Sequence, residues 1–461
     1  MDLRRFSNGI ALCGALALTL AAASPARANP FETTLSNGLR VIVKEDRRAP
    51  VAMHMVWYRV GAMDEKDGTT GIAHLLEHMM FKGTKKLKPG EFNDIVARAG
   101  GNDNAFTSHD YTAYFQRVPA AALPKMIALE ADRMRNLVIG DDEFARELKV
   151  VMEERRLRTD DQPQSQMHEQ LMASAFIAHP YRRPVIGWMN DLENMRPDDA
   201  RDWYRLWYAP NNAYVVVVGD VDHKKVFELV KKHYGHMKPV AQPVRKVTAE
   251  PPQTGERRIV VKAPAELPQL AMAWKVPKLS DVENDREPYA LEVLAGILDG
   301  HAASRLPRAL VRSSQIAVEV GAYYDSTARG EVTFMLGGTP AKGHTVAELE
   351  TALRAEVKRI ADEGVSAAEL ERIKTLTVAA QIYKLDSTYV QAMEIGRLEA
   401  SGYRWQDADR MLEKLRSVTA DEVQAVARKY FGDDTLTVAV LDPQPLDPEA
   451  KPRAKPAGLR H

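Results

Sequence analysis

Apolar positions along the chain recur with two different periods, which predicts a mixture of strands and helices. Alternating or continuous apolar runs, such as 52–60 and 212–219, are typical of β-strands. Apolar residues at every third or fourth position, as over 143–158 and 345–363, predict helices with one buried face. Asn37-Gly38 between two apolar alternations indicates a hairpin turn. Both kinds of element are therefore expected throughout the chain.

The order of elements predicted for the first half of the chain recurs in the second half. Residues 239–257, rich in proline and polar side chains, are interpreted as a linker between the halves. The second half, 258–442, again begins with two strands, continues with a helix over 289–298 and ends in an apolar strand over 435–441. The expected fold class is α+β, with two duplicated domains that each contain a mainly antiparallel sheet packed against helices.

Both ends of the chain have the composition of segments that lie outside a folded core. Residues 1–28 combine the basic pair Arg4-Arg5, an apolar stretch over 10–23 and an Ala-x-Ala site, which predicts a signal peptide cleaved after Ala28. The arginine pair leaves the export route open, and the mature protein is expected to be periplasmic or secreted. The tail, 443–461, is rich in proline and charge and is expected to be disordered.

Composition narrows the classes of function. The 63 basic residues equal the 63 acidic ones, so the charge balance gives no support for nucleic acid or an anionic membrane surface as a partner. No segment reaches the length of a membrane span. The single cysteine, Cys13, lies in the predicted signal peptide, so the mature chain would have neither a disulfide nor a thiol nucleophile.

The strongest candidate chemistry lies in an apolar run of helical periodicity, residues 71–81. It contains His74, Glu77 and His78 in an H-x-x-E-H pattern. Two histidines four positions apart lie on one face of a helix and can bind one metal ion, typically zinc. Glu77 is placed to reach a metal-bound water and to act on it as a general base.

A zinc site needs further protein ligands, and a second predicted helix, 141–158, offers them. Glu147 and Glu154 are one heptad apart and so lie on one face of that helix, while Glu153 points elsewhere. Apolar residues between the two glutamates indicate that this face is buried, where a carboxylate needs a metal or a cation as partner.

Taken together, these two helices resemble the pitrilysin/insulinase family of inverted-zincin metallopeptidases, and in particular its short secreted bacterial type, which is similar to subunits of mitochondrial processing peptidase. The resemblance implies that His74, His78 and Glu154 bind one Zn²⁺ ion per chain and that Glu77 is the catalytic base. It implies that Glu147 supports the site from beside the ligands. The zinc-binding domain would then span 29–238, and the second copy would lack the metal motif.

The same resemblance implies how a peptide substrate binds. Asn104 and Ala105 match positions at which the family contacts substrate, at a sheet edge beside the zinc. There a peptide adds as an extended strand, held by main-chain hydrogen bonds that do not depend on its sequence.

One departure from the family concerns a substrate-binding Arg and Tyr in the second half, whose places are taken here by Val311 and Val318. A register shift by one residue would recover Arg312 but not the tyrosine. We therefore expect a dimer, favouring a heterodimer with a paralogous subunit that lacks the zinc motif and carries this pair. The alternative is a homodimer in which Arg312 or Tyr323 fills the role.

The leading functional hypothesis is a zinc endopeptidase that cleaves unfolded peptides in a chamber, with Glu77 as the general base. One alternative is a processing peptidase with a defined substrate. A second, from another class, is a catalytically silent structural subunit of a peptidase heterodimer, against which the complete H-x-x-E-H pattern argues.

Overall fold

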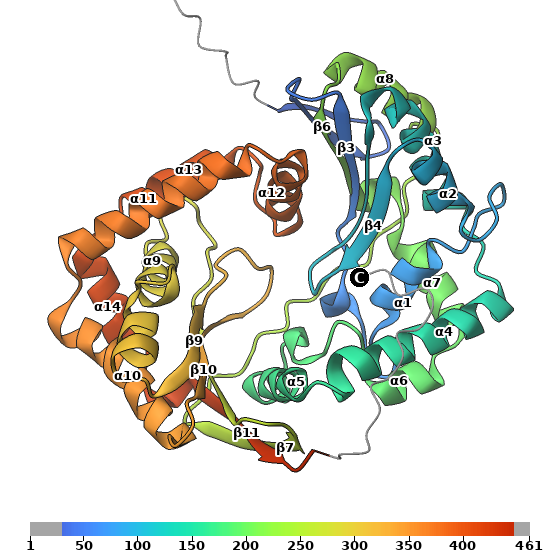
Figure 1. Ribbon diagram of the computed structural model, residues 1–461. Coiled ribbons are helices and arrows are strands. Elements are labelled where there is room, and N and C mark those ends of the chain that lie inside the picture. The colour runs from blue at the N-terminus through green and yellow to red at the C-terminus, as the bar shows by residue number, and fades with distance from the viewer. Residues whose placement is uncertain (1–29, 447–461) are drawn as a thin grey trace, which may run out of the picture.

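The structure is a computed structural model and describes residues 30–446 (Figure 1). The predicted signal peptide and residues 447–461 of the predicted tail lie outside the described residues. The described chain forms two sheets, each packed against helices, which confirms the α+β fold class. We refer to the elements from β1 to α8 as the N-terminal unit and to those from β7 to β11 as the C-terminal unit.

The sheet of the N-terminal unit has six strands in the order β1-β2-β6-β3-β5-β4. Its pairs are antiparallel except for β2 with β6, and every residue of β6 is buried because the sheet is covered on both faces there. The last strand, β4, has a partner on one side only. The strands are β1 (Phe31–Thr34), β2 (Arg40–Glu45), β3 (Val51–Tyr58), β4 (Asn102–Thr107), β5 (Thr112–Pro119) and β6 (Ala213–Gly219).

Helices of the N-terminal unit cover one face of this sheet, where α1, α3, α7 and α8 share a hydrophobic core with β2, β3 and β6. The helices are α1 (Ile72–Met79), α2 (Glu91–Arg98), α3 (Leu123–Asn136), α4 (Asp141–Arg155), α5 (Pro163–Ala175), α6 (Met189–Asn194), α7 (Pro197–Trp207) and α8 (His223–Tyr234). A wider turn, η3 (Arg156–Asp160), continues α4.

The C-terminal unit repeats this arrangement with five strands in the order β7-β11-β8-β10-β9, of which β7 and β11 are parallel. The strands are β7 (Arg257–Pro264), β8 (Gln269–Val276), β9 (Ala317–Tyr323), β10 (Val332–Pro340) and β11 (Leu436–Gln444). The helices are α9 (Glu287–Asp299), η6 (Pro307–Ser313), α10 (Val346–Glu363), α11 (Ala367–Lys384), α12 (Thr388–Ala400), α13 (Asp407–Arg416) and α14 (Ala420–Tyr430). β11 extends two residues into the predicted tail.

The helix that follows the opening strands of each unit marks the duplication. In the N-terminal unit this helix is α1, and in the C-terminal unit it is α9, which contains no histidine. Residues 241–254 join the units without regular secondary structure.

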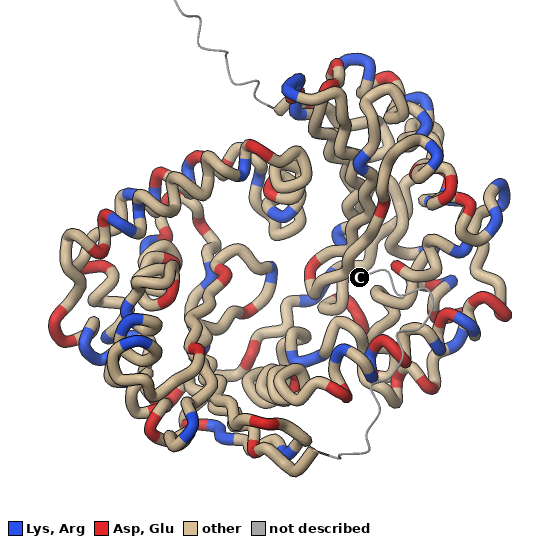
Figure 2. The backbone as a smooth tube through the Cα atoms, in the orientation of Figure 1, with Lys and Arg blue, Asp and Glu red and all other residues tan. Residues whose placement is uncertain are grey.

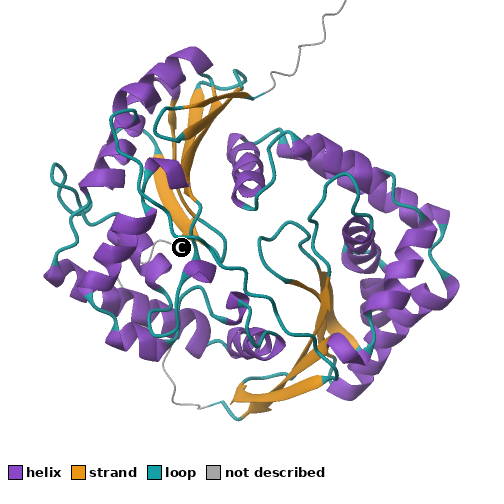
Figure 3. Ribbon diagram, turned by 180° about the vertical axis from the view of Figure 1, so that it is seen from behind, coloured by secondary structure: helices purple, strands orange, loops and turns teal. Residues whose placement is uncertain are grey.

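The two units contact each other across the second face of the N-terminal sheet. α12 lies against β3 and β6 in both views of the molecule (Figures 1 and 3). Gly396 of α12 packs so closely on the Trp57 ring that a Cβ there would lie 2.1 Å from it, and the Tyr214 hydroxyl donates a hydrogen bond to the Gly396 carbonyl at 2.7 Å. A substitution at Gly396 would therefore push the units apart.

Charged residues of both signs are interspersed over both units (Figure 2). Within residues 30–446, none of the helices combines the length and the apolar character needed to cross a membrane.

Candidate metal centre and active site

The candidate centre is built on α1, whose eight residues are all buried. Its first turn is held by Glu65, whose carboxylate accepts hydrogen bonds from the backbone N–H groups of Gly71 and Ala73, each at 2.9 Å. Burial of Glu65 outweighs these bonds and raises the pKa of its carboxyl to about 8. The helical spacing places the His74 and His78 rings on one face, with centroids 4.8 Å apart.

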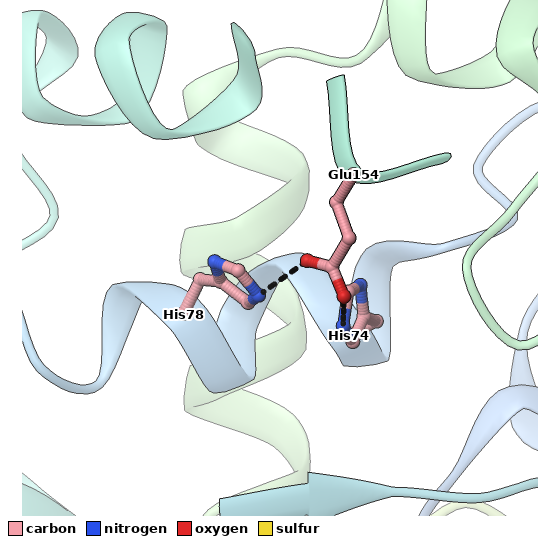
Figure 4. Close-up of side chains that lie close together, drawn as sticks. All are labelled: His74, His78 and Glu154. Atoms are coloured by element: carbon pink, nitrogen blue, oxygen red, sulfur yellow. Dashed lines mark ion pairs between the residues drawn. The ribbon is translucent and has the colours of Figure 1, made fainter. Parts of the chain in front are cut away.

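A carboxylate from α4 meets the two imidazoles, as Figure 4 shows. One ligand atom each from His74, His78 and Glu154 lie within 4.8 Å of one another. The Glu154 carboxylate oxygens are 3.8 Å from Nε2 of His74 and 3.3 Å from Nε2 of His78. Glu153, by contrast, is partly exposed and pairs with Arg156 at 3.0 Å. The structure thus brings together the three residues that the family resemblance implies as ligands, and it turns Glu153 away.

These donors fit a zinc ion. Both carboxylate oxygens of Glu154 are buried without a hydrogen bond of acceptable geometry among the described residues, although Arg158 lies 3.0 Å from one of them. A buried carboxylate in this state is costly unless a cation neutralises it. Two imidazole nitrogens and one carboxylate oxygen are the usual protein ligands of a catalytic zinc, which leaves a fourth position for water or substrate.

Glu147, one heptad before Glu154 on α4, contacts the His78 imidazole at the ring nitrogen that does not face Glu154. Its carboxylate lies 2.8 Å from Nδ1 of His78 and 2.5 Å from Nζ of Lys82. Burial tends to raise the pKa of Glu147, but His78 and Lys82 lower it below its usual value. A carboxylate on Nδ1 fixes the ring orientation and directs Nε2 toward the metal position.

The protonation of His78 reflects this acidic surrounding. Burial alone would lower the pKa of its imidazole, but the carboxylates of Glu147 and Glu154 outweigh burial and raise it above its ordinary value. Burial tends to raise the pKa of Glu154, but His78, His74 and Arg158 hold it below its ordinary value.

Glu77 lies on the same helix and faces the edge of the N-terminal sheet. The Thr107 hydroxyl, at the end of β4, donates a hydrogen bond to its Oε2 at 2.5 Å. Sequence reasoning missed Thr107 and Lys82. No local pattern marked either residue, because Lys82 lies beyond the end of α1 and Thr107 reaches Glu77 only through the packing of β4 beside α1.

The predicted substrate-contacting residues lie on β4, the outer strand of the sheet. Asn104 and Ala105 pair with Phe115 and Tyr114 of β5 on the inner side. The Ala105 backbone N–H donates to the side-chain oxygen of Asn104 at 2.9 Å, while the Ala105 side chain is buried. Only the backbone of Ala105 is therefore available to a bound molecule.

A cavity of about 590 Å³ opens beside this strand and reaches the metal centre. His74, Glu77 and Glu154 form one end of it. The rest of its wall comes from β4, η3, α5 and the loop before α6, with both apolar and polar residues, among them Phe106, Met172, Ile186, Arg158 and His168. The catalytic candidates thus line a space large enough for side chains of a peptide.

Comparison with known proteins assigns most of the chain to one peptidase family. Residues 40–188 match the family model described as Insulinase (Peptidase family M16), and residues 194–377 match the one described as Peptidase M16 inactive domain. The first match contains the whole candidate centre.

Relatives over nearly the full length carry protease names. The zinc protease PqqE of Helicobacter pylori is 35% identical over 89% of this chain and 92% of its own, and an uncharacterized zinc protease of Streptomyces coelicolor is 29% identical over 87% of each. A crystal structure of a protease from Helicobacter pylori matches with a TM-score of 0.85 and 33% identity, over 90% of this chain and 100% of that one. The chain therefore belongs to the insulinase family of peptidases, family M16.

Proposed function

We propose that this protein is a zinc-dependent endopeptidase that hydrolyses peptide bonds in unfolded peptides. The observation that carries the proposal is the buried cluster of His74, His78 and Glu154, with Glu77 beside it, at the open edge of a sheet. The zinc-protease names of its relatives support the same metal.

His74, His78 and Glu154 would hold the zinc, and Glu147 would keep His78 oriented through Nδ1. When bound, zinc lowers the pKa of a coordinated water to near neutrality and polarises a carbonyl group. The chain itself supplies the two imidazoles and the carboxylate, and each imidazole nitrogen must be deprotonated to bind the metal.

Glu77 would act as the general base. It would take a proton from the water that attacks the peptide carbonyl and pass it to the leaving amine. Glu77 is 2% exposed, and this burial would limit the access of bulk water to the transferred proton. The hydrogen bond from Thr107 fixes which carboxylate oxygen faces the sheet and which faces the reacting atoms.

The substrate would bind as an additional strand along β4. Ala105 offers its backbone N–H once the Asn104 side chain releases it, and Asn104 can then donate its amide to a substrate carbonyl. Main-chain pairing of this kind holds extended, unfolded peptides without a strict sequence requirement. The cavity beside β4 would take one substrate side chain.

The site of action would be the periplasm or the exterior of the cell, after removal of residues 1–28. The signal-peptide pattern supports this location. A solved structure titled as the periplasmic protease PqqL from Escherichia coli has a similar fold, with a TM-score of 0.76 at 18% identity.

A silent structural subunit is the second candidate function, because residues 194–377 match an inactive domain and α9 carries no metal ligand. A processing peptidase with one defined substrate would use the same chemistry. The test is to incubate the purified mature chain, with its zinc measured, with a pool of unstructured peptides and to map cleavage sites by mass spectrometry. We expect many cleavages that a zinc chelator abolishes. Absence of cleavage by the zinc-loaded protein would favour the silent subunit. Cleavage at one dominant site would favour the processing peptidase.

A further inference from the structure

A loop of the C-terminal unit reaches the N-terminal unit beside the candidate active site. It joins β9 to β10, spans residues 324–331 and extends from the end of the C-terminal sheet toward the other unit (Figure 1). At its tip, the Arg329 backbone N–H donates to a carboxylate oxygen of Asp110 at 3.0 Å. The Arg329 guanidinium donates to the Asp110 carbonyl at 2.9 Å and lies 3.3 Å from Asp64.

Asp110 occupies the turn of the β4–β5 hairpin and is only 6% exposed. Its other carboxylate oxygen accepts a hydrogen bond from the Tyr181 hydroxyl at 2.5 Å. That hydroxyl in turn accepts one from the Gly330 N–H at 3.0 Å. A Cβ at Gly330 would lie 2.3 Å from the ring of His179, so the loop tip fits this place only with glycine. Both units therefore enclose the Asp110 carboxylate.

The same hairpin carries the group that orients Glu77. Thr107 is the last residue of β4, it pairs with Thr112 across the turn, and its hydroxyl donates to Glu77. Asp110 is three positions after Thr107, and the Ser108 N–H donates a hydrogen bond to the Tyr111 carbonyl at 2.8 Å, which closes the turn. Because the turn is this short, a shift of Asp110 displaces the Thr107 hydroxyl.

We propose that Arg329 is a positioning residue for the catalytic base: by holding Asp110, it fixes the hairpin that presents Thr107 to Glu77. The C-terminal unit would thus set the geometry of the reaction as well as help to enclose the substrate. A terminal carboxylate torsion is broad and needs such a contact to define it, and small displacements of a catalytic group cost large factors in rate. This inference rests on the proposed peptidase function.

Kinetics of Arg329→Ala, Thr107→Val and the double variant test the connection. We expect each single variant to lower kcat about tenfold with KM and zinc content unchanged, because base alignment contributes only to the chemical step. The kcat of the double variant should lie within about twofold of the kcat of Thr107→Val alone, because both changes act through one hydroxyl. The proposal would be overturned if the losses in kcat of the two single variants multiplied in the double variant. It would also be overturned if the kcat of Arg329→Ala lay within twofold of wild type.

Arg404→Ala is the matched control. Arg404 also links the units, through Glu32 at 3.3 Å, but its partner lies on β1, at the opposite edge of the sheet from β4. We expect its kcat to equal that of wild type. An equal loss in Arg404→Ala and Arg329→Ala would mean that any weakening between the units suffices, which contradicts a specific role for Arg329.

Hydrogen exchange of the full-length protein provides a readout that does not depend on activity. Arg329→Ala should speed amide exchange in residues 107–112, whereas Arg404→Ala should not. Asp110→Asn, which keeps the side-chain volume but removes one acceptor, should act in the same direction as Arg329→Ala. Unchanged exchange over 107–112 in both Arg329→Ala and Asp110→Asn would refute the contact as a holder of the hairpin, even if the proposed peptidase activity were absent.

Discussion

Two adjacent glutamates at the end of α4 have opposite environments. Glu154 is fully buried against both histidines, while the side chain of Glu153 is 27% exposed and pairs with Arg156. Since successive helical residues point about 100° apart, only one of the two can face the metal position. The proposed zinc site would therefore depend on the identity of Glu154 and tolerate a change at Glu153.

Glu154→Gln is accordingly expected to lower zinc content after dialysis well below one ion per chain, because an amide is a much weaker zinc ligand than a carboxylate. Glu153→Gln, the control on the same helix turn, should retain full zinc. Metal analysis of the two purified variants checks this. Full zinc in the Glu154 variant together with depletion in the Glu153 variant would assign the ligand to Glu153 instead.

At the scale of elements, the segment that joins the units is fastened by Glu250. Its carboxylate accepts hydrogen bonds from the backbone N–H groups of Ile177, Ala178 and His179, and it pairs with Lys275 at 2.9 Å. Burial tends to raise the pKa of Glu250, but these four contacts lower it to about 2. One side chain thus connects the linker, the loop after α5 and β8.

Glu250→Gln should lower the free energy of unfolding by about 1–2 kcal/mol at pH 7. A carboxyl whose pKa is lower in the folded than in the unfolded protein stabilises the fold at pH values above its unfolded-state pKa of 4.5. It loses that effect as the pH falls toward about 2. The difference in the free energy of unfolding between the variant and the wild type should therefore become smaller as the pH falls over this range. Urea unfolding at pH 7 and pH 3.5, with the exposed Glu266→Gln as control, measures it. A difference that grows on acidification would be contrary to this assignment.

Local patterns were sufficient to predict the strands, the long helices and the candidate ligands. The i, i+4 spacing of His74 and His78 and the heptad spacing of Glu147 and Glu154 are properties of single helices, and α1 and α4 have the expected phase. The helices α6 and α13 were missed, because α6 spans only six residues and α13 is strongly polar and buries none of its residues.

Contacts between distant segments could not be predicted in the same way. Thr107 reaches Glu77 only because β4 folds beside α1, and Arg329 meets Asp110 across 219 positions of sequence. Neither residue belongs to a local motif. Hydrogen bonds of this kind depend on tertiary packing, which hydrophobic periodicity does not encode.

At the scale of the whole molecule, the C-terminal sheet ends in an open edge strand, β9. Val318 and Tyr323 on this strand are 55% and 62% exposed, and Val318 stands where the family resemblance implies a substrate-binding tyrosine. The chain spans 49% of the solved PqqL structure, which has a similar fold. The family resemblance implies that a chain of this length needs a second chain to enclose a substrate chamber.

We expect the mature protein to dimerise, with a heterodimer favoured over a homodimer, because a paralogous chain can supply the missing Arg and Tyr. Light scattering after size-exclusion chromatography gives the stoichiometry, and peptide hydrolysis by the chain alone and mixed with a co-encoded relative gives the functional comparison. The mixture should be markedly faster. Equal rates with zinc bound would contradict the heterodimer and favour a homodimer that uses Arg312 or Tyr323.

The most direct test of the whole account compares wild type with Glu77→Gln for zinc content and peptide hydrolysis in the same preparation. Glutamine keeps the shape of the side chain and its contact with Thr107 but cannot accept the proton of the attacking water. The account predicts equal zinc in both proteins and a loss in kcat of about 10²- to 10⁴-fold in the variant. Turnover of the zinc-loaded variant within a few-fold of wild type would contradict it.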